Sequence, residues 1–134
     1  MADEIRVAIR TDADVVTARQ EARTMGSRLG FSSTDLTLLA TAISEVARNI
    51  TTYAGEGEVL LRVLDQDGRQ GIEVLATDEG PGIDDVELAM QDGFTTGNGL
   101  GLGLPGTRRL VDDFSLQTTP GAGTTVRLVK WIRA

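Results

Sequence analysis

The hydrophobic residues follow two different periods along the chain, and the change between them separates strands from helices. In residues 4–10 the large apolar side chains Ile5, Val7 and Ile9 alternate with Arg6, Ala8 and Arg10, which is typical of a strand with one buried face. From Thr11 to about Leu29, and again from Ser32 to the Tyr53-Ala54-Gly55 run, apolar residues recur three and four positions apart, which predicts two amphipathic helices. Both segments begin with N-cap residue types, and Gly30 is a candidate stop for the first helix.

The second half of the chain predicts mainly strands joined by tight turns. The expected elements are strands 58–64 and 70–77 around an Asp67-Gly68 turn, a possible short helix 84–90, a helix that ends in 107–114, and strands 115–118 and 124–131. This order favours the α+β class: a two-layer sandwich in which a mixed, mostly antiparallel sheet carries its helices on one face. The length of 134 residues is that of a single domain, 1–134.

Composition excludes several classes of chemistry. The chain carries a net charge of −7 and has no run of Lys and Arg, so nucleic acid and anionic membranes are not expected as partners. It has no cysteine and no histidine, which excludes disulfides, thiolate zinc sites, thiol catalysis and imidazole bases. The acidic N-terminus does not resemble a signal peptide and no apolar run is long enough to span a membrane, so a cytoplasmic protein is expected.

Glu45 and Asn49 form the first candidate site. They lie four residues apart near the end of the second predicted helix, so their side chains are neighbours, and they sit off the centre of its apolar stripe, which predicts that they are not core positions. An amide oxygen can ligate Mg²⁺, and a carboxylate can orient or deprotonate a hydroxyl that attacks a phosphate. The same spacing is also common on solvated helix faces, so its meaning depends on the rest of the chain.

Three segments further along bear on this pair. Residues 78–83 (DEGPGI) follow a strand, and their glycines would let the backbone approach a flat ligand, although a plain turn would look similar. Residues 97–106 (GNGLGLGLPG) match a dinucleotide fingerprint only formally, because no strand precedes them, and a lid that closes over phosphates at a helix N-terminus fits better. No P-loop sequence is present. Gly123-Thr124 begins the last strand, where a hydroxyl can reach a ligand.

In this order the four motifs resemble the Bergerat nucleotide-binding fold of DNA gyrase, heat-shock chaperones, histidine kinases and MutL-type repair proteins. Within that superfamily the chain looks like the small stand-alone serine/threonine kinases of the anti-sigma-factor type. The runs that carry the resemblance are AISEVARNI (42–50), DEGPGI (78–83), DGF (92–94), GLGLGLPG (99–106) and Lys130-Trp131.

The resemblance implies ATP and Mg²⁺ as cofactors and assigns roles to particular residues. Glu45 would be the general base and Asn49 the Mg²⁺ ligand. Asp78 would bind the adenine amino group with support from the Thr124 hydroxyl. The implied glycine contacts to the nucleotide are Gly80 and Gly82 at the base, and Gly99, Gly101 and Gly103 at the phosphates.

The resemblance also implies partners. The substrates would be STAS-domain scaffold and antagonist proteins of a stress-response (stressosome) pathway, and the released kinase would activate a PP2C-type phosphatase. An anti-sigma factor, which is a sigma-binding kinase of the same fold, is the alternative.

One departure concerns charge. Many kinases of this type carry a lid arginine where Thr95-Thr96-Gly97-Asn98 stands here, so the phosphate charge would be balanced by Mg²⁺, backbone amides, Arg108, Arg109 or a partner residue. Arg48, beside the catalytic pair, could face either a partner or solvent.

Overall fold

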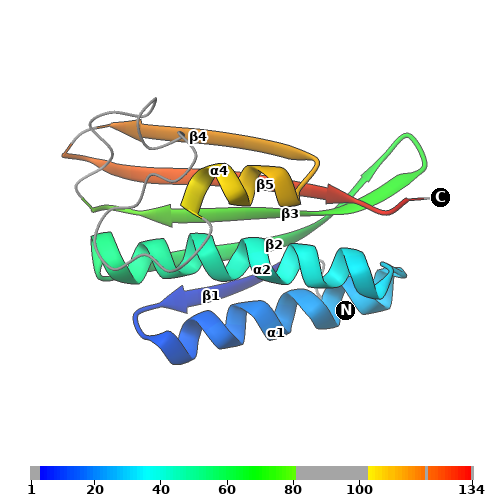
Figure 1. Cartoon of the computed structure of the whole chain (residues 1–134), viewed down its shortest axis with the longest axis horizontal. Coiled ribbons are helices and arrows are strands. Elements are labelled where there is room, and N and C mark those ends of the chain that lie inside the picture. Colours follow the sequence, from blue (N-terminus) through cyan, green and yellow to red (C-terminus); the bar gives the residue numbers. More distant parts are fainter. Residues whose placement is uncertain (1–3, 81–102, 120, 134) are drawn as a thin grey trace.

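The computed structural model describes residues 4–80, 103–119 and 121–133, which form one sheet with helices on one of its faces (Figure 1). The strands are β1 (Glu4–Ile9), β2 (Gly57–Gln66), β3 (Arg69–Asp78), β4 (Asp113–Thr119) and β5 (Gly123–Trp131). The helices are α1 (Asp12–Leu29), α2 (Ser33–Asn49) and α4 (Gly103–Leu110), and the π-helical turn η1 (Ile50–Ala54) follows α2 directly. The predicted α+β sandwich is confirmed.

The sheet has the strand order β1-β2-β3-β5-β4, and each pairing within the described residues is antiparallel. The β2–β3 hairpin closes through Asp67 and Gly68, both at positive φ, as the Asp-Gly signal predicts. Strands β3 and β5 are neighbours although α4 and β4 lie between them in the sequence. The end of β3 and the start of β5 therefore meet at one edge of the molecule, beside the C-terminal end of α2 (Figure 1).

The hydrophobic core lies between the helices and the inner face of the sheet. Alternate residues of β2, β3 and β5 face α1 and α2, as the period of two predicts. Ile43 of α2 and Ile72 and Val74 of β3 are completely buried, and each such side chain contributes about 1.5–3 kcal/mol. None of the helices in the described ranges is long and apolar enough to cross a bilayer.

The helix that was predicted to end in residues 107–114 is α4, and it ends sooner than Phe114. It begins at Gly103 and includes Pro105 in its first turn, where a missing N–H breaks no helical bond. It ends at Leu110, and residues 113 and 114 belong to β4. Pairing with β5 replaces the helix there, because the Asp112 N–H donates to the Val129 carbonyl and the Asp112 carboxylate accepts from the Trp131 N–H at 2.7 Å.

The outer face of the sheet carries a buried carboxylate between two arginines. Glu73 of β3 is only 5% exposed and is paired with Arg62 of β2 and Arg127 of β5. Burial by itself raises the pKa of this carboxyl, but hydrogen bonds and charge from the two guanidiniums outweigh it, so the net pKa of Glu73 lies below its ordinary value. The cluster therefore cross-links three strands as a charged unit.

Candidate functional site

The C-terminal end of α2 presents both residues of the predicted catalytic pair. Asn49 is half-buried, and Glu45, one turn earlier, is only 9% exposed. Neither residue belongs to the hydrophobic core, in line with the prediction, although Glu45 is buried as a polar side chain. The helix is contacted by both α1 and α4, so its polar face is narrower than the apolar stripe alone predicts (Figure 1). A buried carboxylate needs a partner, and Glu45 Oε1 accepts a hydrogen bond from Arg48 Nη1 at 2.9 Å.

A π-helical turn connects this pair to the sheet. Helix α2 passes into η1 at Ile50, and η1 ends at Gly55, whose φ of 87° lies in the left-handed region. Single π turns are rare and are frequent at functional sites. This turn places Ala54 against Gly80 and Ile50 against Gly57. The backbone that carries Asn49 is thus fixed against the strand ends where the predicted adenine contacts lie.

Asp78 occupies the centre of a row of residues across the sheet. The register pairs it with Gly57 of β2 on one side and with Thr124 of β5 on the other, and Thr124 is paired with Thr118 of β4. Because side chains alternate along a strand, all of these positions face the helices, like Val74 and Val126. The structure therefore places two predicted nucleotide contacts, Asp78 and Thr124, side by side on the face that also carries α2.

One oxygen of the Asp78 carboxylate is used locally and the other is available. Asp78 Oδ1 accepts a hydrogen bond from the backbone N–H of Gly80 at 2.9 Å, which forms a tight turn at the end of β3. Oδ2 forms no hydrogen bond with any other described residue. A carboxylate oxygen held in this way can accept a hydrogen bond from an exocyclic amine, which is the role that the sequence predicts for Asp78.

The backbone around Asp78 leaves no room for side chains. A Cβ on Gly80 would lie 2.6 Å from the Ala54 Cβ, and a Cβ on Gly123 would lie 2.3 Å from the Asp78 carbonyl oxygen. A Cβ on Gly57 would lie 2.4 Å from the Thr77 carbonyl oxygen. Gly80 is therefore required by close backbone packing, which is a structural reason for a glycine that was predicted only from its motif.

Sequence reasoning missed two members of this row. Thr118 Oγ1 lies 3.0 Å from Thr124 Oγ1 and donates to the Gly123 carbonyl at 3.2 Å, so it fixes the Thr124 hydroxyl. The other is Gly57, which stands beside Asp78. Strand pairing brings these residues together, and no local pattern signals it. The alternation of residues 114–118 with β5 could have indicated Thr118 once the β4–β5 register was known.

The phosphate side of the predicted site is only partly described. Gly103 is the first residue of α4, whose N-terminus can attract anions through its free N–H groups. Gly82, Gly99 and Gly101, the lid residues before 103 and the possible helix 84–90 lie outside the described residues. Arg108 and Arg109 stand in the last turn of α4, at the end away from Gly103, and are exposed.

The donor set fits a magnesium ion shared with a phosphorylated ligand. No group of three or more acidic, His or Cys residues suitable for a metal occurs within the described residues. Mg²⁺ keeps several waters and commonly binds through one or two protein oxygens plus substrate phosphates. The half-buried Asn49 can supply one such oxygen, since its side chain forms no hydrogen bond within residues 4–80 or the other described ranges.

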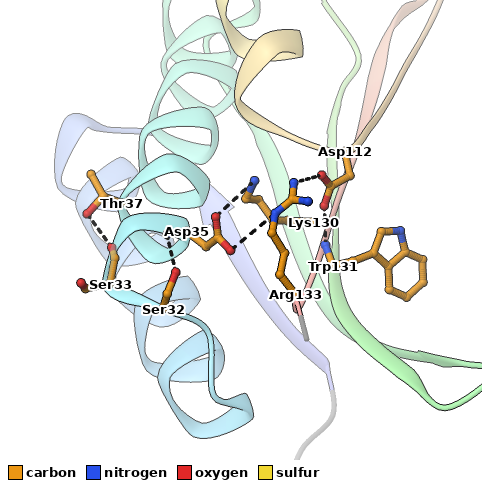
Figure 2. A network of polar contacts seen from close by, with 8 residues as sticks. All are labelled: Ser32, Ser33, Asp35, Thr37, Asp112, Lys130, Trp131 and Arg133. Carbon is orange, nitrogen blue, oxygen red and sulfur yellow. Dashed lines mark hydrogen bonds and ion pairs between the residues drawn. The ribbon is translucent and has the colours of Figure 1, made fainter.

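The opposite end of α2 is anchored to the C-terminal strand by a polar network (Figure 2). Ser32 caps the helix by accepting from the Asp35 N–H, and the Asp35 carboxylate lies 3.7 Å from Nζ of Lys130, an ammonium that is 3% exposed. Arg133 reaches both Asp35, at 4.0 Å, and Asp112, at 2.8 Å. These pairs fix α2 relative to the sheet and so help to set the position of Glu45 and Asn49 at its far end.

Comparison with known proteins agrees with this arrangement. Residues 9–130 match the model of the histidine kinase-like ATPase domain, and the chain belongs to this family.

Individual proteins that are similar to this chain include a serine/threonine kinase and anti-sigma factors. The chain is 46% identical to the serine/threonine-protein kinase RsbT of Bacillus subtilis over 133 residues, which cover 99% of this chain and 100% of that protein. It is 35% identical to an anti-sigma F factor of Caldanaerobacter subterraneus over 86% of this chain and 83% of that protein. These relationships confirm the resemblance and the predicted enzyme class, a protein kinase.

A solved structure confirms the fold alone. The RsbU and RsbW domains of a Mycobacterium tuberculosis protein superpose with a TM-score of 0.66 at 18% identity, over 99% of this chain and 34% of that one.

Proposed function

We propose that this chain is an ATP- and Mg²⁺-dependent serine/threonine kinase and partner switch. Its substrates are Ser or Thr hydroxyls on STAS-domain scaffold and antagonist proteins of a stressosome pathway, and its release from them activates a PP2C-type phosphatase. Because the reaction consumes ATP, we place it in the cytoplasm. The observation that carries the proposal is the position of Glu45 and Asn49 on one end of α2, joined by η1 to the strand ends that hold Asp78 and Thr124.

Asp78 and its neighbours would orient the nucleotide. Its Oδ2 accepts from the adenine amino group while Oδ1 stays in the turn with Gly80, and Thr124, held by Thr118, supports the base. Gly80 and Gly82 let the base lie against the backbone. Asn49 would hold the metal through its amide oxygen, and the bound ion would supply positive charge that partly neutralises the phosphates. Gly103, the first residue of α4, would offer its backbone N–H to the phosphate oxygens, and the resemblance implies the same role for Gly99 and Gly101.

Glu45 would act on the incoming hydroxyl. The hydroxyl oxygen of the substrate forms the new bond to the γ-phosphorus, the bond from that phosphorus to the bridging oxygen of the leaving diphosphate breaks, and Glu45 accepts the hydroxyl proton. The carboxylate is suited to this because it is buried and already ion-paired, which keeps it in one orientation.

The metal assignment is tested by measuring ATP affinity with and without Mg²⁺. For the wild-type protein, Mg²⁺ should tighten ATP binding, and for Asn49→Ala this gain should fall by roughly tenfold, or ~1.4 kcal/mol. Thr52→Ala, an exposed change in the next turn, should behave as wild type. An undiminished Mg²⁺ effect in Asn49→Ala would remove the assignment.

The anti-sigma alternative is kept because of the relationship to an anti-sigma F factor. Two measurements on the purified chain separate the candidates: phosphotransfer from ATP to a STAS-domain protein, and capture of a sigma factor. Phosphotransfer without sigma binding supports the switch kinase. Recovery of a sigma factor, in place of a scaffold protein, would favour the alternative.

A further inference from the structure

The contact between Glu45 and Arg48 joins a buried carboxylate to a half-exposed guanidinium on the same helix. Arg48 Nη1 donates to Glu45 Oε1 at 2.9 Å, and the two residues are three positions apart on α2. The Glu45 side chain is 11% exposed and that of Arg48 is 51% exposed. The guanidinium thus covers the carboxylate from the solvent side of the helix, next to Asn49 in the sequence.

This contact uses one carboxylate oxygen of Glu45. Oε2 forms no hydrogen bond in the part of the chain that the structure describes, whereas Oε1 is fixed by a charged donor. A glutamate side chain has three rotatable bonds, so a carboxylate without a partner samples several orientations. A general base must bring a lone pair within about 2.6–3.2 Å of the proton that it abstracts, and a third group commonly orients it.

The same contact bears on the charge of the site. The proposed reaction brings phosphate oxygens toward Glu45, and like charges a few Å apart repel. The lid sequence 94–106 contains no cation. Arg108 and Arg109 stand in the last turn of α4, whereas Arg48 contacts the catalytic carboxylate directly. Pairing with Arg48 makes Glu45 a neutral ion pair as a whole, so the repulsion between Glu45 and the phosphates is reduced.

Stability alone gives a weaker account of Arg48. An ion pair between residues three apart on a helix, with one partner half-exposed, contributes only about 0.2–0.5 kcal/mol. Glu58 and Arg6 form a comparable pair on the outer face of the sheet, where both side chains are well exposed. The Glu45–Arg48 pair differs in that its acid is buried and occupies the position of the predicted base.

We propose that Arg48 is a positioning residue of the kinase site, which holds Oε1 of Glu45 so that Oε2 faces the substrate hydroxyl. The inference rests on the proposed function, because it assigns Arg48 a role in the reaction that Glu45 performs. Arg48 does not touch the reacting atoms, and its effect passes entirely through Glu45.

The test is a double-mutant cycle on phosphotransfer by the full chain to a STAS-domain protein. Arg48→Ala should lower kcat by roughly 10–100-fold, as expected for a misplaced catalytic group, while the KM for ATP stays within about twofold. Arg48→Lys, which keeps the charge, should recover part of the rate. In a Glu45→Gln background, Arg48→Ala should have almost no further effect, because residues that act as a unit are not additive. Arg6→Ala is the matched control and should leave kcat unchanged.

A second readout needs no nucleotide. In the ATP-free protein the guanidinium proton resonances of Arg48 should move when Glu45 becomes Gln and stay in place when Glu58 becomes Gln. Any of three results would overturn the inference: an Arg48→Ala variant with wild-type kcat, losses of kcat that multiply in the Glu45→Gln, Arg48→Ala double variant, or Arg48 resonances that do not move in Glu45→Gln. In each case phosphotransfer by the wild-type protein would still support the proposed function. A wild-type protein with no phosphotransfer would overturn both.

Discussion

Replacing Gly123 with alanine tests whether the backbone around Asp78 is built as tightly as the structure indicates. Gly123 begins β5 at a φ of 110°, which L residues rarely adopt, and an added Cβ would lie 2.3 Å from the Asp78 carbonyl oxygen and 2.9 Å from the Glu79 Cα. Both neighbours are backbone, so no flexible side chain can move aside. Gly121, two residues earlier in the same turn, also has a positive φ, of 80°, but no described atom within 4 Å of such a Cβ.

These two glycines separate backbone strain from steric overlap. The positive φ costs an alanine about 1–3 kcal/mol at either position. At Gly123 the overlap with the Asp78 backbone adds about 1–3 kcal/mol, as for other overpacked sites. We therefore expect Gly123→Ala to be about 2 kcal/mol less stable than Gly121→Ala. For 134 residues this corresponds to a difference in Tm of roughly 7 °C.

The assays are thermal unfolding and calorimetric titration with ATP. Because the displaced backbone is that of Asp78, Gly123→Ala should also bind ATP roughly tenfold more weakly, whereas Gly121→Ala should bind within twofold of wild type. Equal Tm values for the two variants would refute the close approach. Unchanged ATP affinity in Gly123→Ala would refute the assignment of this strand end to the nucleotide.

Three further substitutions test other parts of the structure. Glu73→Gln should lose about 1–3 kcal/mol at pH 7. Because the pKa of Glu73 is lowered in the folded state, its contribution to stability is complete above the ordinary pKa of about 4.3 and disappears as the pH falls through the folded-state pKa. The difference in unfolding free energy between wild type and Glu73→Gln, measured by urea titration, should therefore be present at neutral pH and vanish at acidic pH. A difference that stays constant with pH would contradict this origin. Asp35→Asn removes the anion that pairs with the buried Lys130 ammonium and should cost about 2–4 kcal/mol in urea unfolding; an unaltered midpoint would mean that the pair is not stabilising. Thr118→Val should weaken ATP binding roughly 3–10-fold through Thr124, with Thr118→Ser as the control, and equal affinities would exclude this route.

Local signals were sufficient to predict most elements of the fold. Thr11 caps α1 together with Asp14, Gly30 ends it at a φ of 97°, and Ser32 caps α2, as their residue types predict. The Asp67-Gly68 turn closes the β2–β3 hairpin. These features depend on residues within a few positions of one another, so the sequence pattern contains the information that determines them.

Features that depend on contacts between distant segments were not predictable in the same way. The limits of α4 and β4 differ from those predicted from the sequence, because the carboxylate of Asp112 accepts a hydrogen bond from β5, which is distant in sequence. The burial of Glu45 depends on the packing of α1 and α4 against α2, and the role of Thr118 depends on the β4–β5 register. Periodicity along one segment carries no information about such neighbours.

The central claim is that Glu45 is the base of an ATP-dependent protein kinase. Its most direct test is the rate at which phosphoserine and phosphothreonine form on a STAS-domain protein, with ATP dissociation constants measured in parallel. Glu45→Gln should lower kcat by about 10²–10⁴-fold with ATP affinity almost unchanged, and Glu58→Gln on the outer face of the sheet should retain the wild-type rate. A Glu45→Gln protein that phosphorylates its partner at the wild-type rate would contradict the account.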